Sequence, residues 1–194
     1  MVARKKAAKV KKVPTVYTED GLVFKSKSML IYYQELKELK KKKIISNFDV
    51  PSKKEQTVEM KTSKFRAVKI MIDDHVFPSI LESKFYIFLK KNMKGLGIKS
   101  FEIQVTFELQ EKFKKYAKSI RAITYTPDFK LTYNNGDVVY IDTKGKVTEE
   151  FKIKQKLFDF KFPQDTLLCI NYDEKEKIWY DISAKKKHDI FAAA

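Results

Sequence analysis

The N-terminal third of the chain contains one segment in which apolar residues recur at helical spacing. These residues are Met29, Tyr32, Tyr33, Leu36 and Leu39. The spacing predicts a helix from about Lys27 to Lys43 with one buried face, and Ser26 is suited to cap its N-terminus. The lysine run at its end suits a helix C-terminus. Short strands are expected at 44–50 and 65–72, with a polar loop at 51–56 between them.

The same pattern returns 53 residues later. When the chain is shifted by 53 positions, ten of the 31 positions from Asp20 to Val50 are identical, and they fall on the apolar stripe and the cap. The shift places Ser79 on Ser26 and predicts a second helix after Ser79. Short helix–strand units can share such a pattern without a common origin, so duplication and coincidence both remain open.

The informative difference between the two copies is Glu82, which stands where the first copy has Met29. As the third residue after Ser79, Glu82 fits a capping box. It also shares a helix face with the apolar residues Phe85, Tyr86 and Leu89, which must be buried. We therefore expect Glu82 to point inward, where a carboxylate needs a partner.

Alternating apolar residues predict strands in the second half of the chain. Phe101–Phe113 reads as one long or two short strands, and 121–133 and 137–144 read as a β-hairpin joined at Asn134–Gly136. A helix is expected from Thr148, its cap, to about Phe160, with Phe151 and Phe158 on its buried face. Two further strands are expected, one buried at 166–172 and one at a sheet edge at 178–182.

The predicted hairpin carries two carboxylates and a lysine where apolar or neutral residues are usual. Asp128 follows Pro127 in the first strand, and Asp142 and Lys144 lie two residues apart near the end of the second, hence on one face. The run Val-Val-Tyr-Ile at 138–141 indicates that the second strand is central and buried on both faces. Charged groups there are costly unless they are paired or bind a metal.

Composition and charge narrow the classes of partner. A 194-residue chain with 43% hydrophobic and 13% aromatic residues is large enough for a sizeable core and is not wholly disordered. The formal net charge of +16 favours nucleic acid as partner, and an anionic membrane surface second. A lysine-rich surface that serves solubility alone is the alternative. The basic tail at 1–15 is expected to be disordered when free and to add non-specific affinity for DNA.

The few cysteine and histidine residues exclude two kinds of site. Cys169 is the single cysteine, and His75 and His188 are the two histidines, so neither an internal disulfide nor a Cys/His zinc site can form. Cys169 lies in an apolar run and is expected to be a core residue in a reducing compartment. No run of 18 apolar residues occurs, so a cytosolic protein with no membrane partner is expected.

Pro127-Asp128 and Asp142-x-Lys144 together resemble the signature of the PD-(D/E)XK nuclease superfamily. Five short motifs extend this resemblance: FxSxxE at 77–82, ExQ at 102–104, YxPDF at 125–129, DxKG at 142–145 and TxxFxxK at 148–154. Together they make the chain similar to phage endonuclease I and other Holliday-junction-resolving enzymes. The resemblance covers about Val76–Tyr172. It does not cover the N-terminal copy, which lacks a matching set of acidic residues.

The resemblance implies an α/β fold with an αβββαβ restriction-endonuclease-like core, in which helices flank a mixed central sheet. The expected organisation is a basic tail at 1–15, a partial α+β repeat at 16–73 used for binding or dimerisation, the nuclease core at 74–184, and a basic C-terminal tail at 185–194. Junction-resolving enzymes cut two strands, so the resemblance also implies a homodimer.

The resemblance further implies Mg²⁺-dependent hydrolysis of DNA, duplex or branched, with Mn²⁺ able to substitute. Asp128, Asp142, the backbone carbonyl of Thr143 and Glu82 would hold the metal, and Lys144 would orient or help deprotonate the attacking water. Further residues expected to contact or position the phosphate are Lys154, Gln104 and Lys146. Two alternatives remain, a non-catalytic DNA-binding or packaging accessory protein that retains the fold, and an RNA-binding protein.

Overall fold

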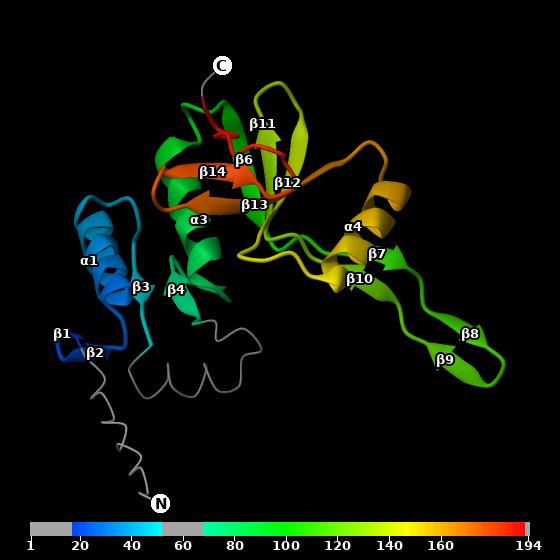
Figure 1. The fold of residues 1–194 in the computed structure, drawn as a ribbon, viewed down its shortest axis with the longest axis horizontal. Helices are drawn as coiled ribbons and strands as arrows, with labels where there is room; N and C mark the ends of the chain where they lie inside the picture. Colours follow the sequence, from blue (N-terminus) through cyan, green and yellow to red (C-terminus); the bar gives the residue numbers. More distant parts are fainter. Residues whose placement is uncertain (1–16, 52–67, 193–194) are drawn as a thin grey trace, which may run out of the picture. The chain divides into compact units, whose positions relative to one another are not determined.

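A computed structural model describes residues 17–51 and 68–192 of the chain (Figure 1). The predicted basic tail at 1–15 and nearly all of the predicted loop at 51–56 lie outside these residues. The chain divides into two compact units, residues 1–78 and 79–194. Within the described ranges it is a mixed α/β protein with three helices and a central mixed sheet.

The described residues of the first unit, 17–51 and 68–78, form one helix and short antiparallel strands. Its elements are β1 (Tyr17–Glu19), β2 (Leu22–Phe24), α1 (Lys27–Lys41), β3 (Phe48–Asp49), β4 (Ile70–Ile72) and β5 (His75–Phe77). β1 pairs with β2, and β3, β4 and β5 form a three-stranded sheet in that order. Ser26 caps α1 by accepting a hydrogen bond from the backbone N–H of Met29. The five apolar residues predicted to be buried on this helix are buried, so this prediction is confirmed.

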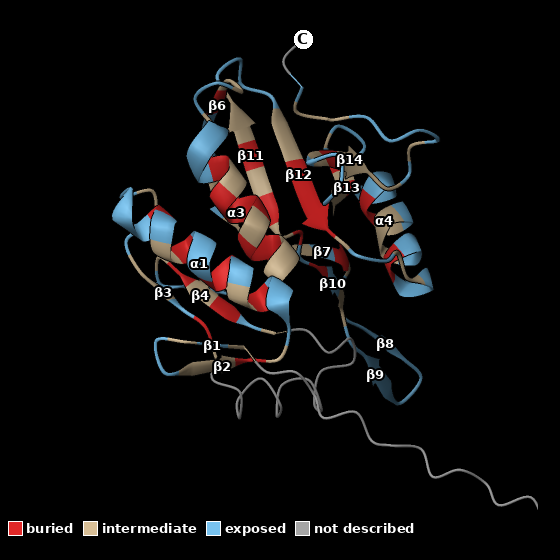
Figure 2. Cartoon of the chain, turned by 60° about the vertical axis from the view of Figure 1, so that its left-hand side comes forward, coloured by how far each residue is buried: buried red, intermediate tan, exposed pale blue. Residues whose placement is uncertain are grey.

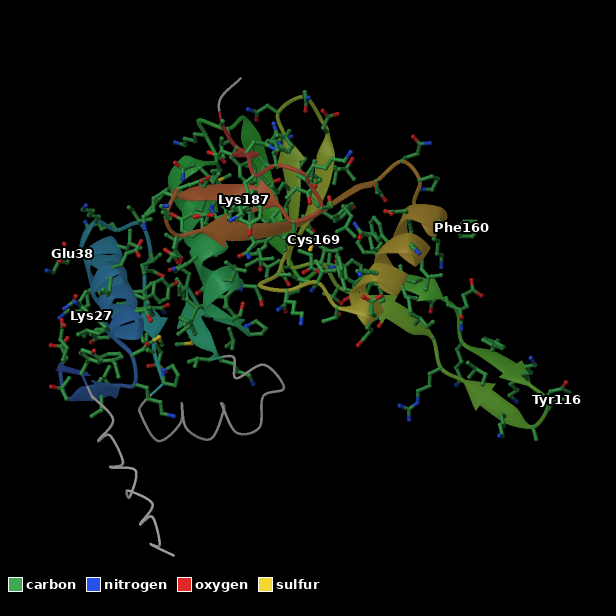
Figure 3. All side chains as sticks on the ribbon, viewed as in Figure 1. Lys27, Glu38, Tyr116, Phe160, Cys169 and Lys187 are labelled. Atoms are coloured by element: carbon green, nitrogen blue, oxygen red, sulfur yellow. The ribbon has the colours of Figure 1, made fainter. Side chains whose placement is uncertain are left out.

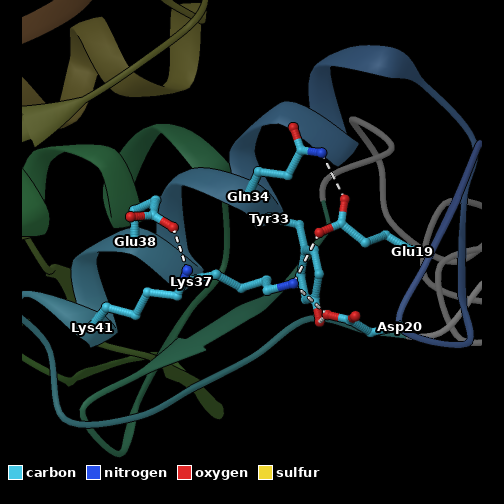
Figure 4. A network of polar contacts seen from close by, with 7 residues as sticks. All are labelled: Glu19, Asp20, Tyr33, Gln34, Lys37, Glu38 and Lys41. Carbon is cyan, nitrogen blue, oxygen red and sulfur yellow. Dashed lines mark hydrogen bonds and ion pairs between the residues drawn. The ribbon is translucent and has the colours of Figure 1, made fainter.

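Polar contacts hold the β1–β2 turn to α1 (Figure 4). Nζ of Lys37 lies 2.9 Å from Oε1 of Glu19 and 2.7 Å from Oδ2 of Asp20. The hydroxyl of Tyr33 donates to the same Asp20 oxygen at 2.9 Å, and Gln34 donates to Glu19 at 2.6 Å. Exposed ion pairs of this kind contribute little individually, but together they fix the hairpin against one side of the helix.

The second unit contains the central sheet. Its elements are α3 (Ile80–Asn92), β6 (Ile98–Ile103), β7 (Phe107–Gln110), β8 (Phe113–Lys115), β9 (Lys118–Ile120), β10 (Ile123–Tyr125), β11 (Phe129–Tyr133), β12 (Val138–Thr143), α4 (Glu149–Lys161), β13 (Thr166–Asp173) and β14 (Ile178–Asp181). Five strands pair in the order β14-β13-β12-β11-β6, with β12 and β13 parallel and the other neighbours antiparallel. β12 is therefore the central strand, as predicted, and its last four residues are buried (Figure 2).

The two helices of this unit pack against opposite faces of the sheet. Phe85 of α3 lies 5.0 Å from Phe129 of β11, ring centroid to ring centroid. Phe158 of α4 lies 5.8 Å from Tyr140 of β12. Since Phe129 is paired with Ile141, the neighbour of Tyr140, the two contacts are on different faces. Cys169 is buried in the core on the α4 side, as predicted. No helix in the described residues is long and apolar enough to cross a membrane.

The first strand of the predicted hairpin is divided, which corrects the prediction of one strand over 121–133. β10 ends at Tyr125 and pairs with β7, whereas β11 begins at Phe129 and pairs with β12 and β6. Pro127 lies in the break, and a proline has no N–H to donate to a sheet. The turn at Asn134–Gly136 is as predicted, with Gly136 at a φ of 93°.

Of the two alternatives for 101–113, one long strand or two short ones, the structure has two strands, β6 and β7, and Phe113 begins β8. The alternation ends at Gln104, whose φ of 58° lies in the left-handed region. Its backbone N–H donates to the carbonyl of Asp128 at 3.0 Å, so the two breaks face each other. The strand predicted at 44–50 is reduced to β3.

The elements of the two sequence copies coincide under the shift of 53 positions. β4, β5 and the start of α3 correspond to β1, β2 and the start of α1, and the pairing of Tyr17 with Phe24 recurs as that of Ile70 with Phe77. Ser26 and Ser79 both act as N-caps with extended backbones. The side chains at the differing position are both buried, Met29 at 5% exposure and Glu82 at 9%. The inward position predicted for Glu82 is therefore found.

Candidate active site

Asp142 and Lys144 form a close ion pair at the end of the central strand. Asp142 is 1% exposed, and its Oδ1 lies 2.7 Å from Nζ of Lys144. The ammonium is not aligned for a hydrogen bond, and Oδ1 has no hydrogen-bond donor among the described residues. Oδ2 accepts a hydrogen bond from the hydroxyl of Tyr125. One oxygen of this buried carboxylate is thus held by a neutral donor, and the other faces only a cation.

Asp128 lies in the break between β10 and β11, and its side chain is held by Thr143 at the end of β12. Its Oδ2 accepts hydrogen bonds from the backbone N–H of Thr143 at 2.7 Å and from the Thr143 hydroxyl at 2.8 Å. Burial, followed by the charges of Asp142 and Glu82, raises the pKa of Asp128 well above its usual range. The Thr143 hydrogen bonds act in the opposite direction but do not outweigh these effects.

Glu82 enters the site from the first turn of α3. The hydroxyl of the N-cap Ser79 accepts a hydrogen bond from the Glu82 backbone N–H and donates one to Oε1 of Glu82 at 2.8 Å. The capping role and the inward role therefore occur together, with the serine hydroxyl as the link. Burial raises the pKa of Glu82 above its ordinary value; Ser79 and Lys144 oppose the shift, and the charge of Asp142 adds to it.

The four residues influence one another electrostatically. Asp142 and Glu82 both contribute to the raised pKa of Asp128, and Lys144 acts on Glu82. Three carboxylates therefore share one cation in a buried region, which leaves an excess of negative charge when all are ionised. A group of this kind favours a bound cation.

Carboxylate oxygens such as those of Asp128 and Asp142 are the ligand type that a hard divalent cation prefers. In this structure the same oxygens contact protein groups. Among the described residues, no three or more His, Cys, Asp or Glu side chains are arranged so that they could hold a metal ion as they stand. Lys144 faces Oδ1 of Asp142, and Thr143 occupies Oδ2 of Asp128. A cation such as Mg²⁺, which prefers carboxylate and carbonyl oxygens, would take the place of Lys144 at Oδ1 of Asp142, the buried oxygen that has no hydrogen bond.

Lys144 is held as a cation. Burial lowers the pKa of Lys144, but the charge of Asp142 and the contact with it outweigh burial, so the pKa is raised. Its Nζ also lies 4.8 Å from the ring centroid of Phe151 on α4, within range of a cation–π contact. In this state Lys144 can donate a hydrogen bond to a water molecule, which is one of its two expected roles.

The residues expected to contact phosphate are less closely linked to this group. Lys154 pairs with Glu150 along α4 at 3.2 Å, and Lys146 is exposed in the loop after β12. The Gln104 side chain is exposed, and Gln104 reaches the site only through its backbone bond to Asp128. Thr143, expected to act through its carbonyl, contacts Asp128 through its N–H and hydroxyl.

Three residues that contact the site were not assigned a role from the sequence, namely Tyr125, Phe151 and Ser79 as a partner of the Glu82 carboxylate. Tyr125 had one available signal, its place three residues before Asp128 in a predicted strand. Phe151 was predicted only as a buried residue of α4. Its contact with Lys144 depends on how α4 packs against the sheet, which no local pattern reveals.

Comparison with known proteins places the chain in a family without giving it an activity. Neither a curated protein sequence nor a solved structure matches the chain. Residues 62–177 match the family described as "Protein of unknown function (DUF1064)". The matched stretch contains all four residues of the candidate site and covers more than half of the chain. The chain therefore belongs to the DUF1064 family.

Proposed function

We propose that this protein is a metal-dependent DNA endonuclease with a PD-(D/E)XK core. The observation that carries the proposal is the grouping of Glu82, Asp128 and Asp142 around Lys144 at one end of the central hairpin. Two buried carboxylates, Glu82 and Asp142, and the half-buried Asp128 share one cation, an arrangement that weakens a fold. Two of the three have raised pKa values. Clusters of this kind occur at functional sites, because binding or catalysis requires charged groups with perturbed pKa values there.

The order of elements supports the same proposal. Leaving aside the strands β7 to β10 and the edge strand β14, the second unit runs α3, β6, β11, β12, α4, β13. This is the αβββαβ order of the nuclease core that the sequence motifs resemble. Asp142 is on its central hairpin, Asp128 directly precedes that hairpin and Glu82 is on its first helix, which is compatible with the resemblance. Fold likeness alone does not establish an activity, so the proposal depends on the site.

The chain's own residues have separable tasks in phosphodiester hydrolysis. Asp128, Asp142, Glu82 and the carbonyl of Thr143 would hold Mg²⁺, which when bound polarises the phosphate and lowers the pKa of a water molecule. Lys144, kept as a cation, would orient the attacking water and offset negative charge on the phosphate. The water oxygen forms a bond to phosphorus and releases a proton to solvent, while the bond from phosphorus to the leaving oxygen breaks and that oxygen takes up a proton from solvent. Tyr125 would fix the orientation of Asp142.

The proposed substrate is DNA, with branched DNA favoured. The net charge of +16 suits a polyanion. A preference for four-way junctions and a homodimer that cuts two strands rest on the resemblance to junction-resolving enzymes. The first unit, whose α1 has Met29 in place of Glu82, would then serve in binding or dimerisation instead of chemistry.

A cleavage assay tests the proposal directly. Purified protein is incubated with a four-way junction, a flap and the matching linear duplex, with and without Mg²⁺. We expect cutting that requires Mg²⁺ and is lost in Asp142→Asn. Asp159→Asn, a change of the same kind on the exposed face of α4, is the control and should retain activity.

The assay also separates the nuclease from the accessory protein. That alternative has one observation in its favour: both oxygens of Asp142 already face protein groups, Lys144 and Tyr125. Tight DNA binding without cleavage in Mg²⁺ or Mn²⁺ would support the accessory protein and overturn the nuclease. Cleavage of RNA but not DNA would overturn both.

A further inference from the structure

The hairpin of β8 and β9 is exposed along its whole length. Every residue from 111 to 121, here called the basic hairpin, is exposed, including the apolar side chains of Phe113 and Ile120. Figures 1 and 3 show it extending away from the five-stranded sheet, with Tyr116 at its tip. An isolated two-stranded hairpin is at best marginally stable in water. This one therefore contributes little to the core, and its sequence can serve another purpose.

The charges of the basic hairpin are almost all positive. Its cationic side chains are Lys112, Lys114, Lys115, Lys118 and Arg121, and Glu111 is its single acidic residue. None of the five cations forms a salt bridge within the described part of the chain. Lys115 and Lys118 are directly paired across the strands, and like charges in that position destabilise a hairpin. This charge pattern suits a polyanionic partner better than it suits the hairpin itself.

The tip of the basic hairpin holds an aromatic residue in an unfavourable conformation. Tyr116 begins the two-residue turn between Lys115 and Lys118, with a φ of 53° and 95% of its surface exposed. Glycine or asparagine is preferred at such a position, because a bulky side chain rarely adopts a positive φ. A free aromatic ring at the end of a basic ribbon is suited to stack on a nucleic-acid base.

We propose that the basic hairpin binds DNA, with its lysines along the phosphate backbone and Tyr116 stacked on an exposed base. The inference deepens the proposed function, on which it rests for the choice of DNA as the polyanion. Exposed bases occur where a duplex is branched or distorted. Binding of an exposed base by the basic hairpin would therefore select for branched or distorted DNA, which the four residues of the candidate active site would not do by themselves.

The arrangement of side chains favours DNA over a membrane or a second subunit. Lys115 and Lys118 flank the tip, whereas the apolar pair Phe113 and Ile120 lies at the far end of the strands. A tip that entered a bilayer would have to carry these two lysines in first, at a high cost. Lysine on an exposed strand also disfavours edge-to-edge pairing with another chain.

The strands that continue the basic hairpin into the body of the second unit connect it to the candidate active site. β7 and β10 continue its two strands and pair with each other. Tyr125 at the end of β10 donates the hydrogen bond to Asp142. DNA held on the basic hairpin would therefore be bound by the same strand pair that positions a catalytic carboxylate.

DNA binding in the absence of any divalent cation tests the inference apart from catalysis. The full chain is titrated against a fluorescent four-way junction and the matching duplex in EDTA over a range of salt concentrations. The first variant replaces Lys112, Lys114, Lys115 and Lys118 by alanine. Its control makes the same substitutions at four exposed lysines elsewhere in the second unit, Lys94, Lys99, Lys156 and Lys175, so that net charge is equal. The second variant is Tyr116→Gly, which suits the positive φ and removes the ring.

We expect the first variant to bind both DNAs at least tenfold more weakly than its control at low salt. Its slope of log K against log salt should be smaller by about 3.6, because each of the four phosphate contacts contributes about 0.9. Tyr116→Gly should weaken junction binding about tenfold and leave duplex binding nearly unchanged. Because all of these substitutions lie on exposed positions, the thermal midpoint should not fall in any variant.

Equal binding by the first variant and its control would overturn the inference. So would a change of oligomeric state on sedimentation in the first variant alone, or selective loss of binding to phosphatidylserine vesicles with DNA binding intact. The outcome is independent of the nuclease proposal. Hairpin-dependent binding without any cleavage would retain the inference and reject the endonuclease, whereas cleavage that is indifferent to these changes would do the reverse.

Discussion

The hydroxyl of Tyr125 donates a hydrogen bond to Oδ2 of Asp142, and both residues are buried. Asp142 is the penultimate residue of the central strand of the five-stranded sheet, whereas Tyr125 belongs to the separate β7–β10 pair. Burial, together with the Asp142 charge, raises the pKa of Tyr125, so the phenol remains a donor at any physiological pH. The bond thus fixes the orientation of the carboxylate from outside its own sheet.

Tyr125→Phe should lower stability and activity together. The change leaves Oδ2 of Asp142 buried without its donor, which costs about 1–3 kcal/mol. We expect this decrease in the free energy of unfolding, followed in urea by the fluorescence of Trp179, the single tryptophan. We also expect a tenfold or greater decrease in the rate of Mg²⁺-dependent cleavage. Tyr140→Phe is the control, since the Tyr140 hydroxyl forms no hydrogen bond among the described residues and its loss should leave both quantities nearly unchanged.

Asp128→Asn should stabilise the protein, and more at high pH than at low pH. A carboxyl whose pKa is raised on folding destabilises the fold when it ionises. The penalty is absent below the unfolded pKa of about 4 and grows as the pH rises through the folded pKa. Asparagine removes the charge, and its oxygen can still accept the Thr143 hydrogen bonds.

We expect the free energy of unfolding of Asp128→Asn to exceed that of the wild type by on the order of 1 kcal/mol at pH 8, because a pKa difference of one is worth about 1.4 kcal/mol. The difference should shrink toward pH 4. Urea unfolding across this range measures it, with Asp159→Asn as a control that should follow the wild type. A difference that is constant with pH would contradict the raised pKa of Asp128.

The parts of the fold that could be predicted from the sequence are those set by local pattern. Helix caps at Ser26 and Thr148, the buried stripe of α1 and the turn before β12 each depend on residues within a few positions of one another. The central position of β12 followed from its apolar run. In each case the local preference and the final structure agree, as is common in natural sequences.

The parts that could not be predicted depend on pairing between distant strands. Pro127 interrupts the segment 121–133, but nothing local shows that β10 and β11 pair with different partners on either side of it. Nothing local indicates that the alternating sequence of β8 and β9 is exposed on both faces. The state of Lys144 likewise depends on Asp142 and Phe151, which lie on different elements. The residues of the candidate site could be predicted, but not the partners that hold them.

Removal of the Lys144 cation should be costly, in contrast to removal of a similar lysine on the same sheet. Lys144 and Lys130 each have 27% exposed side chains and each form one close ion pair. The partner of Lys144 is Asp142, with a 2% exposed side chain, whereas the partner of Lys130 is Glu102, which is 57% exposed. A buried charge that loses its partner costs about 3–5 kcal/mol, but an exposed pair contributes about 1 kcal/mol or less.

We therefore expect Lys144→Met to lower the free energy of unfolding by about 3 kcal/mol and Lys130→Met by less than about 1 kcal/mol. The double variant Asp142→Asn/Lys144→Met should recover most of the loss, because the unpaired charge is gone. Urea unfolding at pH 7 gives all of these values and the coupling energy of the pair. A coupling below about 0.5 kcal/mol would show that the ion pair does not determine the environment of Asp142.

The two copies of the helical unit allow a reciprocal exchange. Glu82→Met places in α3 the residue that α1 has at the same position, and Met29→Glu does the opposite. Glu82 has a raised pKa, so its replacement by an apolar side chain should raise the free energy of unfolding by about 1 kcal/mol at pH 8. Met29→Glu buries a carboxylate on an otherwise apolar face and should lower it by about 3 kcal/mol.

Unfolding in urea followed by circular dichroism measures both variants, and Glu82→Gln is the control that retains an acceptor for the Ser79 hydroxyl. If the two exchanges change the free energy of unfolding in opposite directions, the carboxylate in α3 lowers stability, as expected of a functional group. Mg²⁺ should raise the thermal midpoint of the wild type but have a smaller effect on Glu82→Met, because binding to the folded state alone stabilises it. A loss of stability in Glu82→Met equal to that in Met29→Glu would instead make Glu82 a structural cap.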